Sequence, residues 1–351
     1  MLQPSPSHRI LIVSDAWQPQ VNGVVRTLMT VTAELRAMGH RVEVIGPDRF
    51  RTVRCPTYPD ISLAVLPGRR LIRMIEAFRP DALHIATEGP LGLAARRWAT
   101  RTGFAFTTAF HTRFAEYLKA RTGVPLAPIY AWMRRFHGAG QGTMVATPSL
   151  QSELHSRGFA NIRPWSRGVD LSQFQPFPRE EWDLPRPVFA YVGRIAVEKN
   201  IEAFLDLDLP GSKVVVGGGP LLAKLRRKYP NVHFTGPRHG DALARAYAGA
   251  DVFVFPSVTD TFGLVILESL ACGTPVAAYP VTGPKDVLLD ADGMIGAVDS
   301  DLREACLRAL GADRDACRRH AERYSWRACA ETFLSHLVPL MATPPNAETR
   351  A

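Results

Sequence analysis

Residues 256–275 read PSVTDTFGLVILESLACGTP and lie between two apolar runs, 251–255 and 276–279. Short runs of β-branched and aromatic residues are typical of buried parallel strands. The stretch between them predicts one short helix that begins near Gly263. It stops at Gly273, where glycine can adopt the left-handed conformation, and Pro275 prevents its continuation.

The start of this helix suits a phosphate. Gly263 has no side chain, so a ligand can approach the free N–H groups of the first turn, including that of Leu264, and the positive end of the helix dipole. Asp260 lies just before the helix and Glu268 about a turn and a half into it. The stretch therefore predicts an anion site flanked by two carboxylates, which suit sugar and ribose hydroxyls.

The composition is that of a soluble globular protein with two domains: 351 residues, of which 46% are apolar and 21% charged. The five cysteines are scattered and form no C-x-x-C pair. They favour a reducing cytoplasm and argue against structural zinc. The first residues lack the apolar core of a signal peptide, and nowhere do about 18 apolar residues run together. We therefore expect neither secretion by that route nor a membrane span.

The net charge of +9 is uneven along the chain. Residues 1–168 carry 22 Lys and Arg against 10 Asp and Glu, and the remainder carries 20 against 23. Nucleic acid or an anionic membrane could bind such a basic half, and a solvated arginine-rich surface gives the same count. Residues 114–136 interleave aromatic residues with arginines. This pattern suits a face on an anionic bilayer, but packed helices with exposed arginines have the same composition.

The first half predicts a doubly wound parallel sheet. An apolar run at 9–14 is typical of a central strand, and strand-like runs recur at 42–45, 82–85, 104–108 and 144–147 with helical patterns between them. Gly23 follows the first run and His111 follows the run at 104–108. Because ligands of open α/β sheets bind beyond the carboxyl ends of the strands, both residues should face a cleft. Alone, an Asn-Gly turn and a single histidine are weak signals.

The second half adds two cations. A predicted strand at 188–192 ends at Gly193, and Arg194 and Lys199 follow five positions apart. Facing the helix at Gly263, they would clamp a diphosphate leaving group. The proline-rich segment at 164–187 indicates a linker between the halves.

These motifs, in this order and over about residues 9–340, resemble family 4 (group 1) of the retaining glycosyltransferases. The family signature is a Glu, seven residues and a second Glu around Phe-Gly-Leu, and here the first acid is Asp260. The resemblance implies an α/β fold of the GT-B type: two Rossmann-like domains whose parallel sheets face each other across a cleft, and a C-terminal helix that crosses back to the N-domain. It implies an N-terminal acceptor-binding domain at 1–167, a linker at 168–187, a nucleotide-sugar domain at 188–322, and a crossing helix with a loose tail at 323–351.

The resemblance also implies roles for single residues. The catalytic residues are those that contact the donor sugar, His111 and Asp260, and the two cations that hold the diphosphate, Arg194 and Lys199. The other donor-binding residues are Gly23, Gly263, Leu264, Glu268 at the ribose and Arg238 at the base. Neither a metal nor a cofactor is implied, and no covalent intermediate.

The expected reaction moves a hexose from a UDP- or GDP-sugar to an acceptor hydroxyl. The motifs His-Thr-Arg-Phe at 111–114, Arg-Gly-Val-Asp at 167–170 and Gly-Arg-Ile-x-x-Glu-Lys at 193–199 together most resemble members that glycosylate diacylglycerol. They are also similar to GDP-mannose-dependent α-mannosyltransferases. We therefore expect a lipid acceptor and an anionic membrane surface as partners, not nucleic acid, at the inner face of the cytoplasmic membrane. A sugar-nucleotide epimerase and a non-catalytic nucleotide-binding module are weaker alternatives, the latter because Asp260 replaces Glu.

Overall fold

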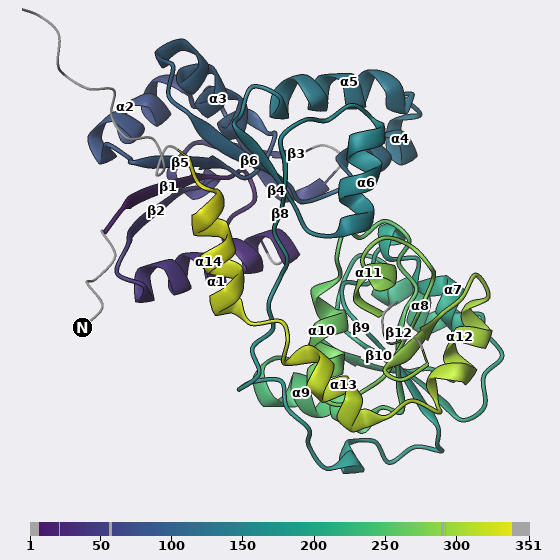
Figure 1. Cartoon of the computed structure of the whole chain (residues 1–351). Coiled ribbons are helices and arrows are strands. Elements are labelled where there is room, and N and C mark those ends of the chain that lie inside the picture. Colours follow the sequence, from purple (N-terminus) through teal and green to yellow (C-terminus); the bar gives the residue numbers. More distant parts are fainter. Residues whose placement is uncertain (1–6, 21, 56–57, 289–290, 292, 339–351) are drawn as a thin grey trace, which may run out of the picture.

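Two six-stranded parallel sheets form the frame of the molecule (Figure 1). The computed structural model describes residues 7–20, 22–55, 58–288, 291 and 293–338. The first sheet has the order β2-β1-β5-β6-β7-β8 and consists of β1 (Arg9–Val13), β2 (Arg41–Ile45), β5 (Ala82–Ile85), β6 (Phe106–Phe110), β7 (Gly142–Val145) and β8 (Ile162–Pro164). The second has the order β11-β10-β9-β12-β13-β14 and consists of β9 (Val188–Val192), β10 (Ser212–Val216), β11 (His233–Gly236), β12 (Val252–Phe255), β13 (Val276–Ala278) and β14 (Gly296–Val298).

Helices cover these sheets. The N-terminal half contains α1 (Gly23–Ala37), α2 (Gly68–Phe78), α3 (Pro90–Thr102), α4 (Phe114–Thr122), α5 (Leu126–His137) and α6 (Pro148–Ser156). The C-terminal half contains α7 (Ile201–Leu205), α8 (Leu222–Lys228), α9 (Gly240–Gly249), α10 (Leu264–Ala271), α11 (Pro284–Leu288), α12 (Leu302–Ala309), α13 (Arg314–Ala321) and α14 (Trp326–His336). The alternation of strands and helices confirms the predicted pair of doubly wound domains.

The central strands read as continuous apolar runs because helices bury both of their faces. Ile10, Leu11, Ile12 and Val13 of β1 are all fully buried. The helix after β1 begins at Gly23, where Asn22 caps it: the Asn22 Oδ1 accepts from the N–H groups of Val24 and Val25, both at 3.0 Å. The polar cap fixes the start of α1 at the carboxyl end of β1.

The C-terminal helix returns to the first domain, as the resemblance implied. In Figure 1, α14 lies against α1. Its residues Trp326, Ala330 and Phe333 are buried in the core that α1 forms with β1 and β2. Trp165, fully buried, donates from its indole nitrogen to the Cys329 carbonyl at 3.2 Å. The chain therefore crosses between the sheets twice, side by side. The tail predicted from Thr343 lies outside the described residues.

The strands predicted at 104–108 and 144–147 are shifted at both ends, to Phe106–Phe110 and Gly142–Val145. β6 begins at Phe106 and not at 104, because the Phe104 N–H still bonds to the Ala99 carbonyl at the left-handed end of α3. β7 ends at Val145 and not at 147, because Thr147 caps α6 by accepting from the Leu150 N–H. Phe104 and Thr147 therefore form hydrogen bonds at the ends of helices and lie outside the strands.

An antiparallel hairpin was not predicted. It consists of β3 (Thr52–Cys55) and β4 (Tyr58–Ala64) and follows the short 3₁₀ turn Pro47–Arg49 after β2. Pro56 and Pro59 interrupt the polar–apolar alternation in this part of the sequence.

Candidate active site

The carboxyl ends of the two sheets meet in direct contact. Thr261, in the loop after β12, donates its hydroxyl to the His111 carbonyl after β6 at 2.7 Å. Ser149, in the first turn of α6, donates its hydroxyl to Asp286 of α11 at 2.7 Å. The residues predicted to act together from the two domains therefore lie at one interface.

Two glycines at helix starts face each other there. Gly263 has φ +83°, and a side chain on it would lie 3.0 Å from both Phe255 and Ile266. No side chain caps α10, so its first turn is open to an anion. A side chain on Gly23, at the start of α1, would lie 3.8 Å from Leu264. The structure thus brings Gly23, Gly263 and Leu264 together.

The loops after β9 and β12 place the predicted cations next to the predicted acid. Lys199 Nζ lies 2.6 Å from Asp260 Oδ1, and the other oxygen of Asp260 is buried without a hydrogen-bond partner among the described residues. Arg194 lies 3.8 Å from Glu198. Asn200, with φ +51°, donates to the Pro256 carbonyl at 3.1 Å and ties the two loops together. The Lys199 and Arg194 side chains keep 27% and 35% of their surface exposed, so a ligand can reach both cations.

Glu268, the predicted ribose ligand, is buried and already holds two donors. One oxygen forms an ion pair with Arg26 of α1, and the other accepts from the Tyr247 hydroxyl at 3.0 Å. Burial raises the pKa of Glu268, and Arg26 opposes that rise. Arg26 was missed because nothing in the sequence connects two positions 242 residues apart. A ribose contact at Glu268 stays a prediction.

His111 presents a defined N–H donor. Its Nδ1 lies 3.3 Å from Nη2 of Arg167, and its Nε2 is buried with no hydrogen-bond partner in the described part of the chain. A guanidinium can only donate, so Nδ1 accepts and the proton belongs on Nε2. Burial lowers the pKa of His111 well below its usual value, and the charges of Arg167, His84 and His137 lower it further. The imidazole is therefore neutral and offers one unused N–H.

Arg167, for which no role at the site was predicted, is itself buried. Its guanidinium donates to the carbonyls of Trp165 and Ser166 at 2.6 and 3.1 Å and lies 4.5 Å from the centre of the Trp165 ring. Burial lowers the pKa of Arg167 to about 10. Burial first, and then this cation, keep the neighbouring His111 neutral.

Two further polar groups already have partners within the chain. Arg238 pairs with Glu181 of the linker and lies 4.7 Å from the Trp182 ring centre, so its predicted base contact stays a prediction. Asp15, which was not predicted, accepts from the Leu91 N–H at 2.8 Å and caps α3. Burial raises the pKa of Asp15 to about 6.

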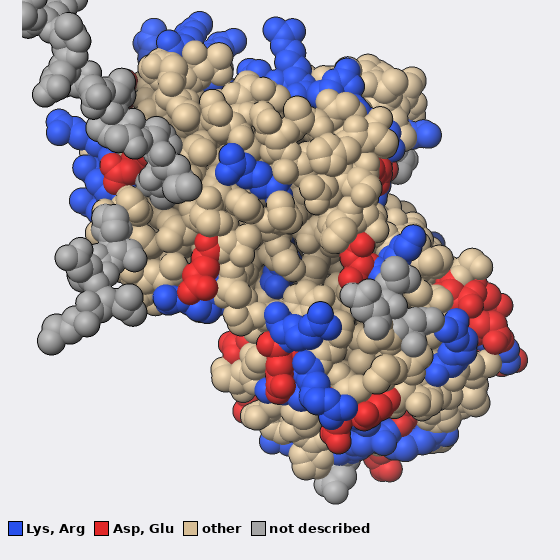
Figure 2. All heavy atoms as spheres, in the orientation of Figure 1, with Lys and Arg blue, Asp and Glu red and all other residues tan. Residues whose placement is uncertain are grey.

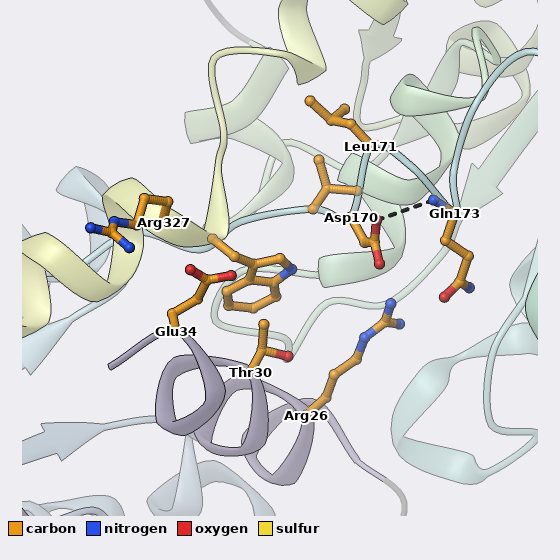
Figure 3. A pocket seen from close by; sticks show the side chains of 9 residues that line it. Arg26, Thr30, Glu34, Asp170, Leu171, Gln173 and Arg327 are labelled. Atoms are coloured by element: carbon orange, nitrogen blue, oxygen red, sulfur yellow. Dashed lines mark hydrogen bonds between the residues drawn. The ribbon is translucent and has the colours of Figure 1, made fainter. Parts of the chain in front are cut away.

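A pocket of about 420 Å³ adjoins the site between α1, the linker and α14. Figure 3 shows Arg26 pointing into it from α1, toward Asp170, whose carboxylate accepts from the Gln173 N–H at 3.1 Å. Trp326 and Arg327 of α14 close the other side. Arg26 therefore lies between the pocket and α10, because it lines the pocket and pairs with Glu268 of α10.

Among the residues that the structure describes, no three His, Cys, Asp or Glu side chains lie close enough to bind a metal ion together. Over the same residues, no helix combines the length and the apolar character needed to span a bilayer.

Comparison with known proteins decides the family. Residues 21–173 match Glycosyltransferase Family 4, and residues 186–311 match Glycosyl transferases group 1. A GDP-mannose-dependent alpha-mannosyltransferase of Mycolicibacterium smegmatis is 32% identical over 370 residues, which cover 93% of this chain and 96% of that protein. The chain belongs to glycosyltransferase family 4.

One further relative and one solved structure are similar to this glycosyltransferase. Alpha-monoglucosyldiacylglycerol synthase of Streptococcus pneumoniae is 27% identical, over 93% of this chain and 83% of that protein. Sucrose-phosphate synthase of Thermosynechococcus elongatus has a similar structure, with a TM-score of 0.71 at 19% identity over 93% of this chain and 97% of that one. The second likeness supports the GT-B fold alone.

Proposed function

We propose that this glycosyltransferase moves a sugar from a nucleotide-sugar donor to the hydroxyl of a membrane lipid such as diacylglycerol, with retention at the anomeric carbon. One observation carries the proposal. Two reachable cations, Arg194 and Lys199, lie on the domain that carries the open start of α10, and the unused N–H of His111 belongs to the opposite domain.

The leaving group would be held by positive charge. The bond between the anomeric carbon and the diphosphate oxygen breaks, and Arg194, Lys199 and the first-turn amides of α10 stabilise the charge that grows on that oxygen. The acceptor oxygen bonds to the same face of the sugar, and its proton passes to the departing phosphate oxygen. The partnerless oxygen of Asp260 and the N–H of His111 would bind hydroxyls of the donor sugar.

These two cations supply charge of the kind that a metal ion supplies elsewhere. We therefore expect the reaction to need no metal, and a chelator to leave the rate unchanged. A rate that falls with chelator and returns with a divalent cation would contradict this part of the proposal.

The acceptor rests on the relatives and on charge. The similarity to alpha-monoglucosyldiacylglycerol synthase favours diacylglycerol, and the basic N-terminal half suits the surface of an anionic membrane. The second candidate is a GDP-mannose-dependent α-mannosyltransferase that acts on a glycan or phospholipid. The relative at 32% identity favours it.

The deciding experiment is nucleotide release from UDP-, GDP- and ADP-sugars, each with and without diacylglycerol in mixed anionic micelles. Turnover of one donor only with the lipid supports the first candidate. Turnover of GDP-mannose with a soluble sugar or a phospholipid, and none with diacylglycerol, supports the second. NMR of the product then gives the anomeric configuration, and inversion would contradict retention.

A further inference from the structure

We propose that the hairpin β3–β4 and the start of α2 form a surface that lies on an anionic bilayer. This ribbon–α2 surface consists of Arg51, Val53, Val65, Leu66, Arg69 and Arg73. The biological role of this surface rests on the proposed lipid acceptor. Its binding to vesicles does not, because that binding can be measured without turnover.

The apolar part of this surface is unusually exposed. Leu66 is 92% exposed, Val53 56% and Val65 42%. Val53 pairs with Leu63 across the hairpin, and the Val65 N–H bonds to the Arg51 carbonyl at 2.8 Å, so these residues are neighbours on one ribbon. Leu66 also has φ +46°, a left-handed conformation that is strained for leucine. Within the described chain, neither the exposure nor the strain has a compensating contact.

The charged part is rich in arginine, although Glu76 lies one turn along α2 from Arg73. α2 buries Leu71, Ile75 and Phe78 and leaves Arg69 and Arg73 exposed. Over the described ranges, no ion pair is found for Arg51, Arg69 or Arg73, which are all exposed. Figure 2 shows Lys and Arg atoms along the edge formed by α2 and α3, whereas blue and red atoms alternate over the C-terminal domain.

The topology puts this surface beside the active site. β1, β2 and β5 are parallel, and α2 leads from the hairpin that follows β2 back to the start of β5. The first turn of α2 therefore lies at the carboxyl edge of the sheet, the edge that carries Gly23 and His111. A side chain on Gly46, which follows β2, would lie 2.6 Å from Trp17 in the loop after β1. A bilayer on this surface would bring lipid headgroups to the mouth of the cleft.

Charge and apolar exposure together favour an anionic bilayer as the partner of this surface. Exposed valine and leucine suit the acyl boundary of a bilayer, and unpaired arginines suit anionic headgroups. A second copy of the same surface is disfavoured, because its arginines would repel. Residues 114–136, the stretch for which the sequence left membrane contact open, fit less well. Ile129, Tyr130, Met133 and Phe136 are buried there, and the exposed apolar side chains Phe114, Val124 and Trp132 reach only 38–40% exposure, against 92% for Leu66.

The test is cosedimentation of the full chain with vesicles of equal parts phosphatidylglycerol and phosphatidylcholine at low salt. The wild type should bind, and the double variant Arg69→Gln/Arg73→Gln should bind about 30-fold more weakly, which corresponds to about 1 kcal/mol for each charge removed. Leu66→Asp should weaken binding by about tenfold or more.

Matched controls lie on the C-terminal domain. Lys224→Gln/Arg227→Gln removes two exposed charges of α8, and Met294→Asp replaces an apolar side chain that is 59% exposed. Both should bind vesicles like the wild type. Equal weakening by controls and surface variants, or a loss of binding only with Trp132→Asp on α5, overturns the proposal. So does a wild-type dimer that Leu66→Asp converts to a monomer.

Donor hydrolysis in water separates this inference from the proposed function. The surface variants should keep the wild-type rate of nucleotide release without lipid, since none of the changed residues lies in the donor site. If vesicle binding behaves as expected and diacylglycerol is not used, the ribbon–α2 surface stands and the acceptor assignment fails.

Discussion

The cations of the active site are partly exposed on the C-terminal domain, whereas the titratable side chains around His111 on the N-terminal domain are buried. On the C-terminal side, Lys199 and Arg194 keep about a third of their surface in solvent. On the N-terminal side, Arg167 is 5% exposed, His84 0% and His137 2%. A group that meets a charged diphosphate must be reachable, whereas the buried groups act on one another. Burial on the N-terminal side therefore sets the protonation of His111, and the exposed cations of the C-terminal domain are left to meet the charge of the diphosphate.

The largest expected effect is on the C-terminal side. Lys199→Ala should lower kcat by about 10²- to 10³-fold, because it removes a cation from the leaving group. Steady-state nucleotide release measures it. The matched control is Lys228→Ala, which breaks another lysine–carboxylate pair of the same domain: Lys228 Nζ lies 2.7 Å from Glu202 Oε1 on the surface. Equal rates for the two variants would remove Lys199 from the mechanism.

The next effect concerns burial of a charge on the N-terminal side. The pKa of Asp15 is about 6 in the folded chain against 3.8 without the fold. Between these values the folded state holds a proton that the unfolded state has lost, so stability falls as pH rises through the window. Relative to Asp15→Asn, the wild type should lose about 2 kcal/mol from pH 4 to pH 6. Urea unfolding of both proteins across this range measures the difference, and parallel curves would show that Asp15 titrates normally.

A smaller effect is expected at His111. His111→Phe keeps a ring but removes the N–H, so kcat/KM should fall by about 10- to 100-fold. Because the pKa of His111 is well below 6.5, the wild-type rate should show no step from this group between pH 6 and 8. His155→Phe, on the exposed end of α6, is the control. A step near pH 6.5 that disappears in His111→Phe would mean that the imidazole is not held neutral.

The smallest effect tests the contact between the two sides. Arg26→Ala leaves the Glu268 carboxylate buried without its cation and should lower the free energy of unfolding by about 1–2 kcal/mol, a modest value because Arg26 is 38% exposed. Adding Glu268→Gln should recover part of that loss in a double-mutant cycle. Arg327→Ala breaks the exposed pair with Glu331 on α14 and serves as the control. Additive effects of Arg26→Ala and Glu268→Gln would show that the ion pair is not formed in solution.

Motifs within one loop or helix were predicted well. Gly263 and Gly273 bound α10 as the sequence indicated, and Gly273 has φ +72°. The strand before Arg194 was predicted with its correct end at residue 192. What the sequence did not reveal is which partner each side chain takes. Lys199 lies against Asp260, and Arg238 lies against the linker.

The sequence by itself determined the two parallel sheets, the order of their motifs and the family, because strand patterns, helix caps and glycine turns depend on residues a few positions apart. Tertiary structure alone decided the ion pair of Arg26 with Glu268, 242 residues apart, and the contact of Arg167 with His111, 56 residues apart. Both contacts form only when buried surfaces pack, and burial then sets the charge of the groups enclosed.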